Sequence, residues 1–311
     1  IPNENLTGSF SFGIGYDSVE KTSLAIGLQE KNFLGTGVKT RIAINTSQKS
    51  TKYNIGVTEP YLQDTPLSLS GDIFDIETEV GQKDIEKLGF ELGLGFRLND
   101  YRNRFGYRFI NSKTTTDASF TGTSISGEEG IEIETSLINY RISSNNTDSF
   151  LNPTNGVKKS LKMSMAGLGG DAKFLKTEAA FKEYIPFNYG DYIFSYGSKL
   201  GVISSLEDEK VTSSNRFYFN SNSVRGFDLN GIGPRDNGND NAVGGNKFYT
   251  GQVEVKAKKL IPGDLGIDIS VFSDIGSLWD TDYPTNVTGV NDSNPRASAG
   301  IAIYWNTVVG P

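Results

Sequence analysis

The residue with the clearest capacity for specific chemistry is Arg225, in the stretch 223–235, which reads Ser-Val-Arg-Gly-Phe-Asp-Leu-Asn-Gly-Ile-Gly-Pro-Arg. A guanidinium group is a rigid fork of donors that can hold one carboxylate through two parallel hydrogen bonds. The glycines and the proline that follow Arg225 favour a tight, shaped turn. A lone loop arginine is ordinarily a solvated charge, so its role depends on the elements that surround it.

Carboxylates are the other candidates for chemistry. Glu91, Glu132, Glu134 and Glu178 invite comparison with a glycosidase or a calcium site, and the segment 236–240 resembles a calcium loop in composition only. No Asp-x-Asp-x-Asp-Gly loop with a distal glutamate occurs. The sequence also has no histidine and no cysteine, which removes the commonest general base, the commonest zinc ligand and thiol chemistry. We therefore predict no enzyme activity, no catalytic residue, no metal site and no cofactor.

Composition narrows the class further. The net charge of −7 over 311 residues argues against a nucleic-acid partner. Hydrophobic residues make up 36%, and no apolar run approaches the ~18 residues that a membrane-spanning helix needs. Glycine is abundant with 36 residues, beside 14 tyrosines and 19 phenylalanines, and glycine alternating with aromatic residues is typical of membrane barrels.

Alternation of apolar and small polar residues runs through the chain and predicts about fourteen strands. In the first, Phe10, Phe12, Ile14 and Tyr16 share one face and Ser or Gly occupies the other. The eighth, 132–142, alternates irregularly, so its faces stay unassigned. The alternation predicts which residues face lipid and which face the lumen. The predicted lipid-facing residues include Phe12, Ile26, Leu92, Val253 and Ile301, and the predicted lumen-facing residues include Ser11, Gly27, Gly93, Glu254 and Gly300.

A single ring of about fourteen strands leaves an interior too wide for side chains to fill. A polar lumen and a lipid-facing exterior satisfy both faces, and closure pairs the backbone groups as lipid requires. The fold class predicted is therefore all-β, an antiparallel transmembrane β-barrel. The alternative is a large soluble protein of two packed sheets.

The connections also fit an outer-membrane barrel. Those after even strands are short, at 31–37, 60–66, 99–104, 185–191 and 261–264, whereas long ones follow odd strands, at 111–130, 206–246 and 280–296. This pattern places the N-terminus and the short turns in the periplasm and the loop of Arg225 outside. Interface girdles are predicted from aromatic residues near strand ends: Tyr107, Tyr192, Tyr196, Trp279, Tyr283, Tyr304 and Trp305.

The tetrapeptide Val224-Arg225-Gly226-Phe227 resembles the Val-Arg-Gly-Phe motif of the BamA family, barrel proteins that insert other barrels into bacterial outer membranes. The resemblance extends from Thr7 to Pro311. It includes the segments 242–246 (Ala-Val-Gly-Gly-Asn), 153–156 (Pro-Thr-Asn-Gly) and 32–37 (Asn-Phe-Leu-Gly-Thr-Gly).

The resemblance implies that the long loop folds back into the lumen, where Arg225 pairs with Glu254 and Asp274. The alternation independently places both acids on inward faces of adjacent strands. The predicted lumen lock consists of Val224, Arg225, Gly226, Phe227, Glu254 and Asp274.

The resemblance also implies a mechanism that is not enzymatic. The seam between first and last strands opens, and the edge of the first strand pairs with an incoming client strand. The predicted pairing residues are Gly8, Ser9, Phe10, Ser11, Phe12, Gly13, Ile14 and Gly15. The partners implied are the outer-membrane bilayer, unfolded outer-membrane clients and periplasmic accessory lipoproteins.

Two departures from the family are expected. Residues 1–311 form a single barrel domain without the periplasmic POTRA domains, and the last two of the family's sixteen strands are absent from this chain. We therefore predict that the first strand and the strand 297–306 are not paired. A polypeptide exporter of the two-partner-secretion type is the alternative function. A passive porin is a less favoured alternative, because long inward-folding loops would restrict conductance through the lumen.

Overall fold

The computed structural model describes residues 7–17, 21–117, 122, 128–150, 152–258, 266–283 and 285–305. Fourteen strands form one antiparallel sheet, in which every strand pairs with its neighbours in chain order. Two further strands, β12 (Arg235–Asp236) and β15 (Val287–Thr288), lie in two different long loops and pair with each other. The helical elements of the described residues are four 3-10 turns, η1 (Phe33–Gly35), η2 (Leu62–Asp64), η3 (Asn188–Gly190) and η4 (Ser213–Asn215).

The strands of the large sheet agree in number with the sequence prediction. They are β1 (Gly8–Asp17), β2 (Lys21–Glu30), β3 (Lys39–Thr46), β4 (Ser50–Glu59), β5 (Leu67–Val80), β6 (Lys83–Leu98), β7 (Tyr101–Thr116), β8 (Glu132–Asn145), β9 (Gly156–Gly170), β10 (Phe174–Phe187), β11 (Tyr192–Ser205), β13 (Lys247–Ala257), β14 (Ile267–Trp279) and β16 (Arg296–Trp305).

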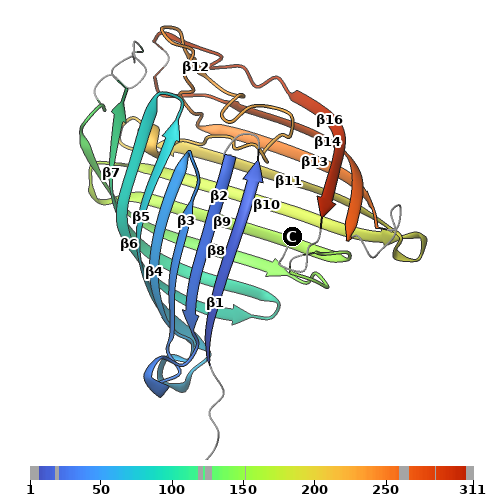
Figure 1. Cartoon of the computed structure of the whole chain (residues 1–311). Coiled ribbons are helices and arrows are strands. Elements are labelled where there is room, and N and C mark those ends of the chain that lie inside the picture. The colour runs from blue at the N-terminus through green and yellow to red at the C-terminus, as the bar shows by residue number, and fades with distance from the viewer. Residues whose placement is uncertain are drawn as a thin grey trace, which may run out of the picture.

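The sheet curves round into a barrel wall with β1 and β16 at its two edges (Figure 1). Within the described residues, β1 has a ladder only to β2, and β16 only to β14. The two edge strands stand apart in Figure 1. Asn306, the predicted end of the last strand, lies outside the described residues.

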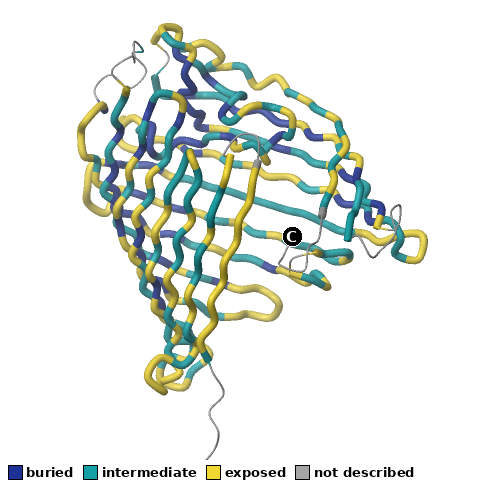
Figure 2. Tube along the Cα trace, in the orientation of Figure 1, coloured by how far each residue is buried: buried dark blue, intermediate teal, exposed yellow. Residues whose placement is uncertain are grey.

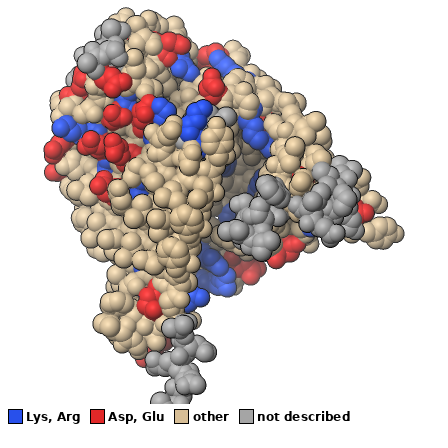
Figure 3. All heavy atoms as spheres, in the orientation of Figure 1, with Lys and Arg blue, Asp and Glu red and all other residues tan. Residues whose placement is uncertain are grey.

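Many large apolar residues of the strands are exposed, and exposed residues recur along the strands of the wall (Figure 2). Leu92 is 53% exposed and Ile301 71%, while Phe12 and Val253 are also exposed and Ile26 is half-buried. Their neighbours Gly93 and Glu254 are buried on the other face. A surface with so many large exposed apolar residues suits a lipid surrounding and not water. Figure 3 shows an uncharged band over β1–β4, with charged side chains gathered towards the upper end. In the described part of the chain, no helix has the length and apolarity for a membrane span.

Several strand boundaries differ from the sequence prediction. β7 continues to Thr116, because its polar residues still pair with β6 as far as Thr116 and with β8 as far as Lys113. The register of β8 against β9 shifts between Thr135 and Leu137, and such a bulge moves side chains to the opposite face. This irregularity explains why residues 132–142 gave no clean alternation. The turn before Tyr101 is also shorter than predicted, and β10 extends to Phe187. The predicted turn 261–264 and Leu265 lie outside the described residues.

Two of the predicted girdle aromatics are not on the lipid side. The hydroxyl of Tyr304 donates to Glu254 Oε1 at 2.8 Å, inside the wall. The ring of Tyr283 lies 4.5 Å from the guanidinium carbon of Arg216 within the loop layer. Neighbouring strand residues point to opposite faces, so Tyr304 and Trp305 cannot both face lipid. The side chain of Trp305 is outside the described set.

The turn between β8 and β9 is organised by Asp148. Its Oδ1 accepts from the backbone N–H groups of Thr154 at 2.8 Å and Asn155 at 3.1 Å, and its Oδ2 accepts from the Thr154 hydroxyl. The hydrogen bonds from Thr154 first, then the backbone donors, lower the pKa of Asp148 from 3.8 to about 2. The segment 153–156 that resembled a family turn therefore closes around a carboxylate.

We expect Asp148→Asn to lower the unfolding temperature of the barrel at neutral pH and to have little effect near pH 2. Because the folded-state pKa lies below 3.8, the carboxylate stabilises the turn above about pH 4 and loses this contribution as the pH falls to about 2. Unfolding temperatures of both proteins measured across this range check the prediction. A difference that stays constant with pH would contradict it.

Candidate functional site

The loop 206–246 between β11 and β13, here called the plug loop, packs against the inner wall (gold in Figure 1). It contributes nearly half of the largest buried apolar cluster of the described residues. Members from the loop and from the wall are Val211, Phe217, Phe219, Val224 and Ile232, and Leu137, Ala166, Phe174, Ile203 and Leu278. Burial of these side chains, at roughly 1.5–3 kcal/mol each, holds the loop inside the barrel.

At the tip of the plug loop, Arg225 contacts both acids that the sequence analysis paired with it. Its Nε donates to Asp274 Oδ2 at 2.7 Å and its Nη2 to Asp274 Oδ1 at 2.8 Å, which is the two-bond fork. Its Nη1 donates to Glu254 Oε2 at 2.8 Å. The backbone N–H of Arg225 also donates to Asp274 Oδ2 at 3.0 Å. One arginine therefore joins the loop to β13 and β14.

This ion cluster is well shielded from water. The side chain of Asp274 is 0% exposed, that of Glu254 10% and that of Arg225 21%. The guanidinium carbon lies 3.7 Å from the centre of the Phe272 ring, and Tyr304 donates to the remaining oxygen of Glu254. Each carboxylate oxygen of the cluster thus has a partner, which a buried ion group requires for stability.

Glycines make room for the tip. Gly226 has a φ of +87°, a conformation that residues with a Cβ rarely adopt. On the wall beneath, a Cβ at Gly276 of β14 would lie 2.7 Å from Val224 Cγ2. Val224 itself is 2% exposed. Phe227 packs, partly buried, on the same apolar cluster. The four residues of the Val-Arg-Gly-Phe motif therefore act together as one packed tip.

A second set of contacts anchors the base of the plug loop, and sequence reasoning missed it. The buried Arg216 donates through Nε to Val211 O at 3.1 Å and through Nη1 to Val243 O at 3.0 Å. Its Nη2 lies 3.6 Å from Glu128 Oε1. Glu128 Oε2 in turn accepts from the backbone N–H of Ser213 at 2.8 Å and from its hydroxyl at 2.7 Å. The loop after β7 and the plug loop are thus joined by an ion pair.

Three wall lysines complete this anchor. Lys83 donates to Ala242 O at 2.6 Å, Lys176 to Asn215 O at 2.8 Å, and Lys87 to Ser214 O. Their acceptors are backbone carbonyls, which carry no residue signature in a sequence.

The segment 242–246 supplies part of the same anchor. Val243, fully buried, offers its carbonyl to Arg216 and also to the Tyr218 hydroxyl at 3.0 Å. Burial raises the pKa of Tyr218, which keeps the phenol protonated as a donor. Gly245 exchanges two backbone hydrogen bonds with Phe217, at 2.9 and 3.0 Å. The resemblance noted for this segment therefore falls on residues that close the plug loop on itself.

The predicted pairing residues, Gly8 to Gly15, all lie in β1, at the free edge of the described sheet. Lys31 N donates to Thr7 O at 3.3 Å, which marks these two residues as a hydrogen-bonded pair. Hydrogen-bonded pairs alternate along an antiparallel ladder, so the odd residues from Ser9 onward bond to β2. The main-chain groups of Gly8, Phe10, Phe12 and Ile14 therefore point away from β2. In the part of the chain that the structure describes, no group of His, Cys, Asp or Glu is arranged to hold a metal.

Comparison with known proteins gives this arrangement a family. Residues 32–311 match the model of the Omp85 superfamily domain. The chain belongs to the Omp85 superfamily. Over 99% of its length it is 27% identical to the outer membrane protein assembly factor BamA of Neorickettsia risticii, and it spans 42% of that Omp85 relative.

Two solved structures share the fold. The barrel of Haemophilus ducreyi BamA lacking POTRA domains 1–3 superposes with a TM-score of 0.85 at 24% identity, over 99% of this chain and 66% of that one. CdiB from Acinetobacter baumannii gives 0.55 at 12% identity, over 96% of this chain and 54% of that one. The chain is thus an outer-membrane β-barrel protein of the bacterial type, and it spans about two fifths of the length of its BamA relative.

Proposed function

We propose that this chain is the barrel part of an outer-membrane protein assembly factor, which folds and inserts β-barrel clients. The observation that carries the proposal is the edge of β1, which has no partner strand among the described residues; there Gly8, Phe10, Phe12 and Ile14 present main-chain donors and acceptors away from β2. An incoming client strand can add to such an edge through main-chain hydrogen bonds, which depend little on client sequence. A protein that assembles many different barrels needs contacts that do not depend on the client's sequence.

The plug loop has a separate part in this proposal. It closes the lumen from the side of the long loops, and the Arg225 cluster ties its tip to β13 and β14, next to the edge strand β16. We infer that the cluster acts as the lumen lock, which holds the wall beside the seam in shape while β1 moves. Periplasmic domains, accessory lipoproteins and a lateral opening of the seam belong to the same proposal, by analogy with the BamA relative.

The test is a proline at the free edge. Phe12→Pro removes an N–H that points away from β2, and proline is tolerated at such edge positions. Loss of one main-chain hydrogen bond to the client, at about 1 kcal/mol, should slow client insertion by about fivefold. The measurement is folding of a urea-denatured barrel client into liposomes that contain the protein, followed by protease resistance.

Phe12→Ala is the matched control, because it removes the same side chain and keeps the N–H. It should insert clients at nearly the wild-type rate. Equal rates for the proline and alanine variants would remove the free edge from the mechanism. If the wild-type protein speeds no client's insertion but passes one dedicated polypeptide across the membrane, the protein is an exporter.

A further inference from the structure

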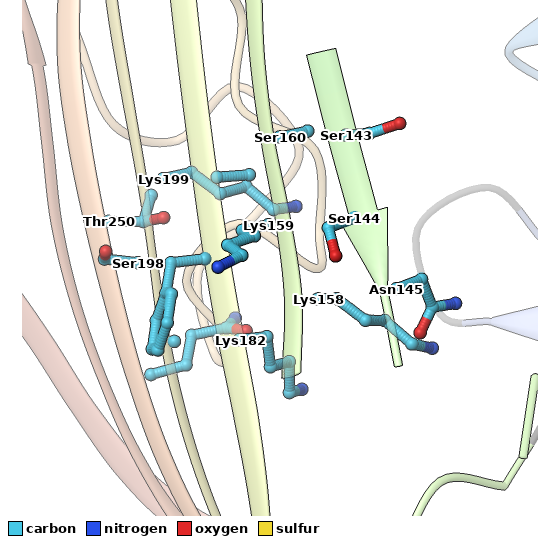
Figure 4. A pocket seen from close by; sticks show the side chains of 14 residues that line it. Ser143, Ser144, Asn145, Lys158, Lys159, Ser160, Lys182, Ser198, Lys199 and Thr250 are labelled. Carbon is cyan, nitrogen blue, oxygen red and sulfur yellow. The ribbon is translucent and has the colours of Figure 1, made fainter. Parts of the chain in front are cut away.

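Three lysines gather on the inner wall between the turn after β8 and the tip of the plug loop. Lys158 of β9 lies directly opposite Lys182 of β10, and Lys182 pairs with Gly197, two residues before Lys199 of β11. Residues in these register positions share one face of the sheet. Together with Thr250 they line a pocket of about 260 Å³ (Figure 4). Lys158, Lys182 and Lys199 are called the lysine patch below.

In the described part of the wall, the lysine patch has an acid within electrostatic range only at Lys182, which interacts with Glu254 and also with Arg225 of the lumen lock. Like charges directly opposite each other on neighbouring strands destabilise a sheet. Within the described residues, none of the three lysines forms an ion pair with an acid. Lys158 and Lys182 lie 5.8 and 5.4 Å from the centre of the Tyr184 ring, and Lys158 also approaches Phe150 O at 3.4 Å. Elsewhere on the wall, Arg104 and Arg108 meet Glu91.

The position of the patch points to a ligand that enters from the side of the short turns. Lys158 is the third residue of β9, directly after the turn organised by Asp148. At the other end of the pocket, Gln252 donates to Asn222 O of the plug loop at 3.0 Å. The patch therefore covers the wall from the mouth of the barrel up to the plug loop.

The loops of this chain indicate which loop segments a barrel client would bring into the lumen. In each of its three longest loops, 117–131, 206–246 and 280–295, acidic residues outnumber basic ones. A client of the same class has loops of this kind to bring through. We infer that the lysine patch binds acidic loop segments of barrel clients during assembly, an inference that rests on the proposed function. Exposed lysine–carboxylate pairs contribute only ~0.2–1 kcal/mol each, so the loop can be released afterwards.

The first test is binding of a fluorescent peptide with the sequence of residues 204–213, which contains Glu207, Asp208 and Glu209. The detergent-solubilised protein should bind it more tightly than a peptide with amides at these three positions, and added salt should weaken binding. Replacement of the patch by glutamine (K158Q, K182Q and K199Q together) should weaken binding by about tenfold. The matched control removes three lysines that do not line this pocket (K39Q, K52Q and K113Q) and should change little.

Lys52 makes this control sharp, because it lies on the inner face of the wall, next to the exposed Tyr53 of β4, but lines a different pocket. Equal weakening by the two triple variants would overturn the inference, as would equal binding of the acidic and amide peptides. If phosphatidylglycerol in mixed micelles displaces the acidic peptide from the patch, the site is one for lipid headgroups and the inference also fails.

A second test separates this inference from the proposed function. Two versions of one barrel client, with acidic loops and with the same loops in amide form, are folded into liposomes by each protein. The ratio of the acidic-loop rate to the amide-loop rate should fall several-fold in the patch variant and stay at the wild-type value in the control variant. An unchanged ratio refutes the lysine patch alone. Failure of the wild-type protein to speed either client refutes the proposed function.

Discussion

Replacing Arg225 by alanine should lower the free energy of unfolding of the barrel by about 3–5 kcal/mol and release the tip of the plug loop. The change removes the three hydrogen bonds that the guanidinium donates and leaves Asp274 and Glu254 buried without their arginine. Stranding a buried charge costs more than the ion pair is worth, because the charge stays desolvated. Urea titration followed by tryptophan fluorescence measures the change.

Arg225→Lys should recover only part of the loss. A lysine restores the positive charge but not the fork that bonds both oxygens of Asp274 while also reaching Glu254. Client insertion should fall with stability in both variants if the cluster supports the seam.

Arg235 provides the matched control. It is an arginine of the same plug loop, and it donates to the backbone carbonyls of Asp240 and Asn230 at 2.8 and 2.7 Å. Its replacement by alanine breaks hydrogen bonds without stranding a carboxylate, so the cost should be nearer 1–2 kcal/mol. Equal losses for Arg225→Ala and Arg235→Ala would show that the buried acids do not carry the effect.

The sequence was sufficient for the strand order and for most of the faces, because both follow from a local period of two. The alternation through Leu92 and Gly93 is unbroken, and the structure places one outside and the other inside. The alternation did not predict the faces where the strand pairing is irregular, as at the register shift between Thr135 and Leu137. A bulge depends on the pairing of two strands, which no single segment reveals.

Sequence reasoning likewise predicted one part of the candidate site and missed another. Arg225 could be matched to Glu254 and Asp274 because a motif marked the arginine and strand parity placed both acids inside. The base of the plug loop could not be found in this way. Lys83 and Arg216 donate to the carbonyls of Ala242 and Val243, and any residue type offers a carbonyl. Glu128 reaches Arg216 from a different loop, a contact set by tertiary folding alone.

The outward face of β6 offers the sharpest test of the membrane placement. Leu92→Arg should destabilise the barrel in a bilayer by about 2–4 kcal/mol, because Leu92 is exposed in the middle of the apolar band and a guanidinium there must be desolvated. The measurement is reversible unfolding from liposomes in denaturant.

Leu98→Arg is the depth control. Leu98 lies on the same face at the last residue of β6, 63% exposed, beside the short turn before β7. An arginine near the membrane interface should cost only about 0–1 kcal/mol, since its side chain can reach the headgroups and water. The same two substitutions should differ little in detergent micelles, which adapt their thickness around a charge. A cost at position 92 no larger than that at position 98 in a bilayer would mean that the exposed band of β6 does not face lipid.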